Sequence, residues 1–153
     1  MGLVRFIADL FSLSGRRSFR SPDEGEDPDQ WLGREGERLA ARYLRRHGYK
    51  VLYRNFRAPH GGEVDVVCRD KTCDTLVFVE VKTRRSLAFG TPGEAVTREK
   101  QKLIARGALA GLELLGNPEI IFRFDIVEIL FEEDTPSFHI IKDAFKLPEP
   151  YIY

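Results

Sequence analysis

The sequence predicts an α/β fold with a mixed central sheet flanked by helices. Two long stretches place apolar residues at the spacing of an amphipathic helix, and five stretches rich in Val, Ile and Phe are typical of strands. Hydrophobic residues make up 42% of the 153 residues, which suits one folded domain. The expected elements are a helix over 31–47, strands over 49–57, 63–69 and 75–84, a helix over 98–115, and strands over 120–131 and 138–141. The order is therefore α-β-β-β-α-β with an extra strand after it.

The first long helix carries apolar residues on one side and arginines on the other. Its inward stripe consists of Gly, Ala, Leu and Tyr residues, and Gly48 marks its C-terminal end. Glu37 lies on the edge of this stripe. A single Glu in an Arg-rich helix is usually a surface ion-pair partner, so Glu37 gains a functional role only if the helix packs its first turn towards other carboxylates. The outward residues are Arg34, Arg38, Arg42, Arg45 and Arg46.

The second and third strands form a predicted antiparallel hairpin, because residues 70–74 between them have turn chemistry. With the centre of the hairpin between Thr72 and Cys73, Asp65 lies directly opposite Glu80. Directly opposed side chains have Cβ atoms roughly 5 Å apart, and like charges there are destabilising. The two carboxylates therefore require a cation or a shared proton.

This register divides the hairpin between two faces. One face pairs Val64 with Val81, Val66 with Val79 and Cys68 with Val77, and the other pairs Glu63 with Lys82, Asp65 with Glu80 and Val67 with Phe78. Lys82 then shares the face of Glu80, where its ammonium can reach a phosphate or a nucleophilic water. Oxygen ligands without nearby His favour Mg²⁺ or Mn²⁺ as the cation. The alternative is a solvated face with ordinary ion pairs, and the hairpin residues alone leave the two interpretations equal.

Charge is segregated along the chain although the formal net charge is zero. Residues 1–30 carry a net −2, residues 34–106 a net +8, and residues 107–153 a net −6. A basic middle segment indicates an anionic partner such as nucleic acid, most simply DNA. A solvated basic face on the first helix explains only part of this excess.

Candidate phosphate contacts lie after the strand that carries Glu80 and at the start of the second long helix. Thr97 is the predicted N-cap of that helix, and helix N-termini attract anions. Solvated end residues remain an alternative there. Asp125, inside the apolar strand over 120–131, is expected at a strand face or edge. The candidate nucleic-acid contacts are Arg34, Arg38, Arg84, Arg85, Lys100 and Gln101.

The N-terminal segment differs in composition from the rest. Residues 2–13 have the periodicity of an amphipathic helix too short to span a membrane, and the acidic stretch over 21–29 has the composition of a flexible linker. Cys68 and Cys73 are too few and too badly spaced for a zinc site or a disulfide framework, which suits the reducing cytoplasm. The expected organisation is an N-terminal helix and linker over 1–30, one domain over 31–145 and a tail over 146–153.

A set of short motifs is spread over about residues 31 to 131. They are Gly33 to Ala40, Tyr43 and Leu44, Gly48 and Tyr49, Asn55, Gly62 to Asp65, Phe78 to Arg84, Phe89 and Gly90, and Arg123 to Asp125. In combination they resemble the YraN family, a largely uncharacterised bacterial family. The resemblance implies a restriction-endonuclease-like fold of the PD-(D/E)xK superfamily, which includes the archaeal Holliday-junction resolvases.

The resemblance also implies roles for particular residues. Nucleases of the superfamily have an Asp followed, on the next strand, by a Glu and a Lys separated by one residue. Asp65 and Glu80 resemble the metal ligands, together with the Val81 carbonyl, and Lys82 resembles the catalytic lysine. Glu37 matches the first-helix Glu that the resolvases place beside the metal, where it would hold a second metal or orient water.

The activity implied by the resemblance is Mg²⁺- or Mn²⁺-dependent hydrolysis of phosphodiester bonds. Cutting of branched DNA is an analogy to the resolvases. The resolvases are dimers, so the same analogy suggests a homodimer for this chain. Val64 stands where the superfamily has a Pro before the Asp. Two other interpretations remain: a nucleic-acid-binding module that keeps the fold but cleaves nothing, and an interaction protein recruited through the helix over 2–13.

Overall fold

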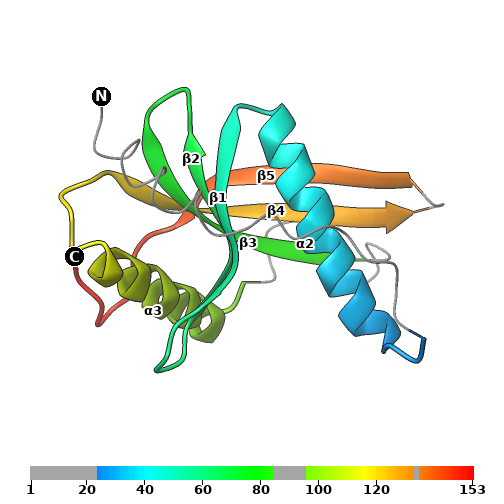
Figure 1. Ribbon diagram of the computed structural model, residues 1–153, viewed down its shortest axis with the longest axis horizontal. Coiled ribbons are helices and arrows are strands. Elements are labelled where there is room, and N and C mark those ends of the chain that lie inside the picture. Colours follow the sequence, from blue (N-terminus) through cyan, green and yellow to red (C-terminus); the bar gives the residue numbers. More distant parts are fainter. Residues whose placement is uncertain (1–23, 85–95, 133–134) are drawn as a thin grey trace.

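The computed structural model describes residues 24–84, 96–132 and 135–153 (Figure 1). Its elements follow the predicted order of a helix, three strands, a second helix and two strands. The helix predicted over 2–13, the linker before residue 24 and the loop that begins at Arg85 lie outside the described residues. Within the described ranges, no helix is both long enough and apolar enough to cross a membrane.

The helices and strands are close to the predicted ones. The helices are α2 (Pro28–Arg46) and α3 (Arg98–Leu114), and the strands are β1 (Tyr49–Arg57), β2 (Glu63–Asp70), β3 (Thr75–Arg84), β4 (Phe122–Glu132) and β5 (Thr135–Phe145). Across the described residues the strands form one mixed sheet in the order β1-β2-β3-β4-β5. All neighbours are antiparallel except β3 and β4, which are parallel because α3 connects them. The predicted fold class is therefore confirmed.

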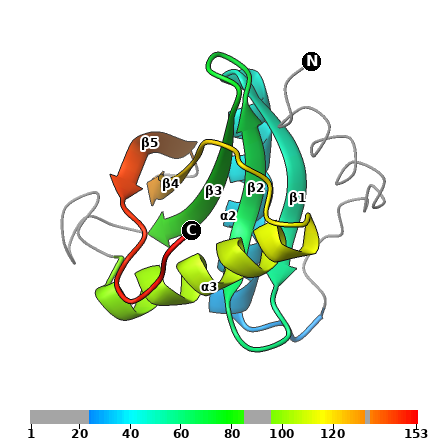
Figure 2. The ribbon, with the colours of Figure 1, turned by 90° about the vertical axis from the view of Figure 1, so that its left-hand side faces the viewer.

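The two helices lie on opposite faces of the sheet, as Figure 1 and Figure 2 show together. On the α2 face, Ala40 and Leu44 pack with Val79 in one buried cluster. On the α3 face, Ile104 packs with Phe78 in another. Alternate residues of the central strands thus serve two separate cores, which is what fixes the sheet between the helices.

Helix α2 begins at Pro28 rather than at the predicted Trp31. Asp27 is its N-cap, and the Asp27 side chain accepts a hydrogen bond from the backbone N–H of Asp29. Proline suits the first turn because a backbone N–H there would have no partner within the helix. The acidic residues at the end of the predicted linker therefore start the helix.

The β2–β3 hairpin has the predicted register near its turn. Val66 pairs with Val79, and the pairing continues as far as the turn. In the other direction, the β2–β3 ladder ends at Val66 and Val79. Beyond this point, Val64 packs in the α3-side cluster, whereas Val66 packs in the α2-side cluster. Val64 and Val66 therefore belong to different core clusters, contrary to the predicted placement on one face, although β1 pairs with both of them without a register shift between them.

The C-terminal part of the chain is more ordered than the sequence indicates. Strand β5 runs to Phe145, beyond the predicted end at Ile141, and passes through Asp143, which has a φ of +51° at a register shift. The predicted tail over 146–153 packs Leu147 and Tyr151 against the α3-side cluster. This tail therefore adds apolar surface to the core beneath α3.

Candidate functional site

Two glycines set how closely the helices approach the β2–β3 hairpin at the end away from its turn. This open end consists of the start of β2, with Glu63 and Asp65, and the end of β3, from Glu80 onward. A Cβ built on Gly36 of α2 would be 2.0 Å from the methyl carbon of Thr83. A Cβ built on Gly107 of α3 would be 2.8 Å from the backbone nitrogen of Glu63. Both distances are too short for a side chain, so only glycine permits this packing. The contacts bring Glu37 of α2 and the first turns of α3 close to the strands.

The hairpin opens at Asp65. The regular ladder does not include the predicted pair of Asp65 and Glu80. Instead, Oδ2 of Asp65 accepts a 2.8 Å hydrogen bond from the backbone N–H of Val81. The carboxylate of Asp65 thus takes the place of a backbone carbonyl as the acceptor for Val81, the residue after Glu80. This bond holds the Asp65 side chain between the two strands.

Glu80 is the buried acid of this region, with 4% of its surface exposed. Its Oε2 atom is buried and has no hydrogen-bond partner among the described residues. Burial, followed by the negative charge of Asp65, raises the pKa of Glu80 to about 8. A hydrogen bond between the two carboxyl groups adds to this rise, and it forms only while one of them holds a proton. When both are ionised, the pair needs a cation.

Lys100 reaches these acids from the first turn of α3. Its Nζ forms an ion pair with Oε1 of Glu63 and lies 3.6 Å from Oε1 of Glu80. The hydrogen bond from Lys100 lowers the pKa of Glu63. Burial lowers the pKa of Lys100, but the bond to Glu63 and the charge of Glu80 outweigh burial and leave the pKa of Lys100 raised. Lys100 is therefore a charged bridge between two acids, a contact that the sequence analysis missed.

Glu37 approaches the same region from α2. Burial, and then the charge of Asp65, raises the pKa of Glu37 to about 7, while Arg54 and Arg57 of β1 lower it. Arg57 also lies 3.7 Å from Glu63, measured from Nη1 to Oε2. A functional role for Glu37 required that its helix pack towards other carboxylates. The structure has this arrangement, because α2 brings Glu37 within electrostatic reach of Asp65 and Glu63.

Lys82 follows Glu80 on β3 and pairs in register with Glu128 of β4. The alternation of side chains along β3 puts Lys82 on the face of Glu80, as predicted. The charge of Lys82 also opposes the rise in the pKa of Glu80. The alternative interpretation of a solvated face included an ion pair between Lys82 and Glu63, but Glu63 pairs with Lys100 and Arg57 instead.

The acids at the open end suit a cation that needs few protein ligands. Within the described ranges, no three side chains of His, Cys, Asp or Glu lie close enough together to hold a metal ion. Mg²⁺, however, is often bound by one or two carboxylates and keeps several waters. The unpartnered Oε2 of Glu80 beside Asp65 fits such an ion. Val81, the expected carbonyl ligand, lies directly beside the pair.

The predicted nucleic-acid contacts on α2 have partners within the chain. Arg34 forms an ion pair with Glu26, and Arg38 forms one with Glu35. The arginine side chains of both pairs are partly exposed, so each pair contributes little to stability and its glutamate can be exchanged for another anion.

The predicted contacts beyond α2 are not gathered at one place. The side-chain amide of Gln101 donates to the carbonyl of Val96 at the start of α3, where an anion was expected. Arg84 lines a pocket with residues of β4 and β5 that include Ser137. Arg85 lies outside the described residues. The structure therefore brings together Glu37, Asp65, Glu80, Val81, Lys82 and Lys100 but not the remaining candidates.

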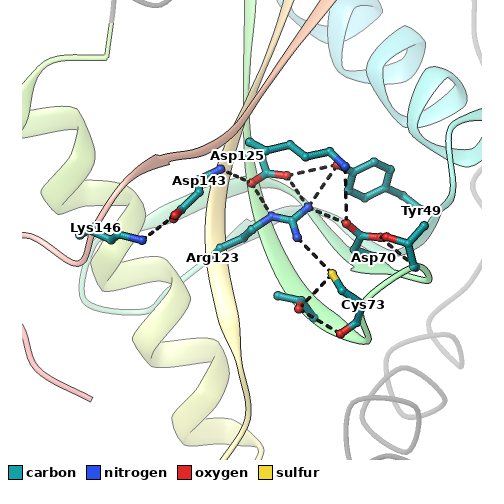
Figure 3. A network of polar contacts seen from close by, with 10 residues as sticks. Tyr49, Asp70, Cys73, Arg123, Asp125, Asp143 and Lys146 are labelled. Carbon is teal, nitrogen blue, oxygen red and sulfur yellow. Dashed lines mark hydrogen bonds and ion pairs between the residues drawn. The ribbon is translucent and has the colours of Figure 1, made fainter.

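A second group of buried charges lies at the turn end of the hairpin. Arg123 of β4 donates to both oxygens of Asp125 and, at 2.8 Å, to Asp70 (Figure 3). Asp125 also accepts bonds from the Tyr49 hydroxyl and from the backbone N–H of Asp143. Of the two predicted positions for Asp125, a strand face or an edge, the structure has the face: Asp125 is fully buried, and its strand β4 lies inside the sheet. An Arg and an Asp two residues apart in an apolar strand share a face, and that pattern was the available signal.

Comparison with known proteins gives a consistent family match. The model of the family described as "Uncharacterised protein family UPF0102" matches residues 36–129. The chain is 47% identical over 125 residues to a UPF0102 protein of Geobacter sulfurreducens, covering 81% of this chain and 95% of that protein. It is 50% identical over 101 residues to one of Chlorobaculum tepidum, covering 66% and 76%, and 41% identical over 116 residues to one of Caldicellulosiruptor saccharolyticus, covering 74% and 96%. The names of these relatives specify no activity.

Proposed function

The chain belongs to the UPF0102 family, and from the acids at the open end of its β2–β3 hairpin we propose that it is a metal-dependent nuclease acting on DNA. The observation that carries this proposal is the buried Glu80, which lies beside Asp65 and has an Oε2 atom without a partner among the described residues. Leaving a buried polar group unpaired costs about 1–3 kcal/mol, and more for a charged group. Such a cost is typical of a site that is completed by a ligand.

Asp65, Glu80 and the carbonyl of Val81 would hold Mg²⁺ or Mn²⁺. The ion, when bound, would polarise the phosphodiester and lower the pKa of a water molecule. Its charge would also remove the repulsion between the two carboxylates, which is the unfavourable feature of the protein without metal. The protein residues around it then have separate roles.

Lys82 and Glu37 have the chemistry that hydrolysis requires of the protein. Lys82 shares the face of Glu80, and its ammonium would stabilise the negative charge that develops on the phosphate. Glu37 has a pKa raised to about 7, so its carboxyl can accept or release a proton near neutral pH. It would orient the attacking water from the α2 side of the site.

Basic side chains outside the group of acids would bind the nucleic-acid backbone. Contacts between phosphates and Lys or Arg release counterions, so the affinity should fall steeply with salt. Preference for branched DNA, and a homodimer, rest on the analogy with the resolvases. The proposed contacts are Arg34, Arg38, Arg84 and Arg85, whereas the other two predicted contacts are engaged within the chain, Lys100 with Glu63 and Gln101 with the Val96 carbonyl.

A nucleic-acid-binding protein without catalysis is the second candidate. The observation that favours it is that no three metal-binding side chains come together within the described ranges. A protein of this kind would keep the basic surface and would hold the proton shared by Asp65 and Glu80 in place of a metal ion. The two candidates differ in whether divalent ions change what the protein does to DNA.

The test is a cleavage assay with Mg²⁺ or Mn²⁺ on single-stranded, duplex, flapped and four-way-junction DNA. We expect cleavage that falls at least about 100-fold in Asp65→Ala and Lys82→Ala, with DNA binding retained. Lys71→Ala is the matched control, because Lys71 is exposed at the turn end of the same hairpin. It should cleave like the wild type.

Two other results would change the conclusion. Salt-sensitive binding without cleavage on any of these DNAs would support the binding protein. Cleavage that persists equally in Asp65→Ala and Lys82→Ala would reject the proposed site. Preference for one DNA shape would identify the substrate class.

A further inference from the structure

Lys100 is placed among the acids too firmly to be an ordinary surface lysine. Its side chain is 26% exposed, and it contacts Glu63 and the almost fully buried Glu80 at the same time. Exposed ion pairs contribute little and are easily exchanged, but a pair with a buried partner is costly to break. The ammonium is therefore part of the site.

The backbone around Lys100 is fixed independently of this ion pair. The Thr97 side chain accepts a hydrogen bond from the backbone N–H of Lys100 and so caps α3. About two helical turns further on, Gly107 packs directly against the backbone of Glu63. The helix that carries Lys100 and the strand that carries its partner are thus held together by contacts that involve neither charge.

The two oxygens of Glu80 have different surroundings. Oε1 lies 3.6 Å from Nζ of Lys100, whereas Oε2 is buried without a partner among the described residues. In two-metal sites, a shared carboxylate commonly lies between two ions that are about 3.5–4 Å apart. Here one side of Glu80 already has a positive charge, and the other side does not.

We propose that Lys100 takes the place of a second divalent ion, so that the open end of the hairpin binds one ion fewer than its acids would otherwise hold. Glu63 and Oε1 of Glu80 are neutralised by the ammonium, and Oε2 of Glu80 with Asp65 is left for a metal ion. This inference rests on the proposed function only for that remaining ion.

The experiment is a calorimetric titration of the full chain with Mn²⁺ at pH 7.5, comparing the wild type with Lys100→Met. We expect the variant to bind one Mn²⁺ more per chain than the wild type. Without metal, its melting temperature should be lower than that of the wild type, because Glu63 and Glu80 lose their cation, and Mn²⁺ should close most of this gap. Lys102→Met is the matched control, because Lys102 lies two residues further along α3, and it should bind the same number of ions as the wild type.

Two more variants keep the test decisive. Lys100→Arg retains a cation and should keep the wild-type number of ions. Lys100→Gln removes the charge but keeps a hydrogen-bond donor for Glu63, and it replaces the methionine variant if that variant does not fold.

The difference in bound ions between variant and wild type tests the inference, whereas the wild-type number tests the proposed metal site. Equal numbers in both proteins would overturn the role of Lys100, even if the wild type binds one ion and cleaves DNA. A wild type that binds no Mn²⁺ would overturn the proposed metal site. An additional ion in Lys100→Met would support the inference in either case.

Discussion

The β2–β3 hairpin has buried acids at both of its ends, and the acids at the two ends differ in their charge and hydrogen-bond partners. At the turn end, Asp70 and Asp125 are both bound by Arg123 (Figure 3). At the open end, Glu80 is almost equally buried, but its Oε2 atom has no partner among the described residues. The same sheet thus contains a satisfied and an unsatisfied arrangement of carboxylates.

The pKa values of the acids reflect this difference. Burial alone would raise the pKa of Asp70, but hydrogen bonds from Thr72 and Arg123 outweigh burial and hold it well below its usual range. At the open end, burial and Asp65 raise the pKa of Glu80 to about 8. The turn end therefore keeps Asp70 ionised in the folded protein, whereas the open end gains from a proton or a cation. We interpret the first as structural and the second as functional.

The largest effect should come from removing the cation at the turn end. Arg123→Met leaves the buried Asp125 without its charge partner and Asp70 with only Lys142, 3.8 Å away, and we expect a loss of about 3–5 kcal/mol in the free energy of unfolding. Urea denaturation followed by circular dichroism measures it. Arg69→Met is the matched control, because Arg69 pairs with the more exposed Asp74, and it should cost less than about 1 kcal/mol. Equal losses in the two variants would contradict a special role for the buried network.

The next effect concerns how closely α3 approaches the open end. Gly107→Ala places a methyl group 2.8 Å from backbone atoms of Glu63, so we expect a loss of about 2–3 kcal/mol. Gly111→Ala is the matched control on the same helix, because its nearest neighbour, Phe56, is 3.8 Å away. Alanine there should be neutral or stabilise the helix by up to about 1 kcal/mol. If thermal unfolding shows the two variants to be alike, the close packing of α3 on β2 is wrong.

Neutralising the unsatisfied acid should stabilise the protein. In EDTA at pH 8, we expect Glu80→Gln to raise the free energy of unfolding by about 2 kcal/mol, since it removes a buried charge that lies beside Asp65 and whose Oε2 atom has no partner among the described residues. The folded pKa of Glu80 is above its ordinary value of 4.5, so the cost of ionising it appears as the pH rises from about 4.5 and is complete above about 8. The gain should therefore shrink towards pH 5. A gain that is independent of pH would contradict the raised pKa.

The corresponding change at the turn end should have the opposite sign and a smaller size. Asp70→Asn weakens bonds from Thr72 and Arg123, and we expect a loss of about 1.5 kcal/mol at pH 7. Because the folded pKa of Asp70 is below its ordinary value, its contribution is present at neutral pH and is lost as the pH falls below about 4. Unfolding measured from pH 3 to pH 8 should show the two variants diverging as the pH rises. If the free energies of unfolding of Glu80→Gln and Asp70→Asn change in parallel with pH, the two ends of the hairpin do not differ in the way proposed.

Local patterns in the sequence determined much of the fold and part of the site. The bounds of β1 and β3, the Thr97 cap of α3 and the hairpin register near the turn follow from periodicity and turn chemistry within short segments. The proximity of Asp65 and Glu80 follows from the same hairpin, because only a short turn separates their strands. Such patterns predict interactions between residues that are close together in the sequence.

Only the tertiary structure decided which distant side chains complete each end. Lys100 reaches Glu63 and Glu80 because Gly107 lets α3 lie against the backbone of β2. Arg123 reaches Asp70, 53 residues away in the chain, because β4 lies beside β3 in a parallel pair. Periodicity indicates which face of an element is buried, but not what it meets across the core. That choice depends on how closely the helices and strands pack, and it separates the satisfied end of the hairpin from the end that is left for a ligand.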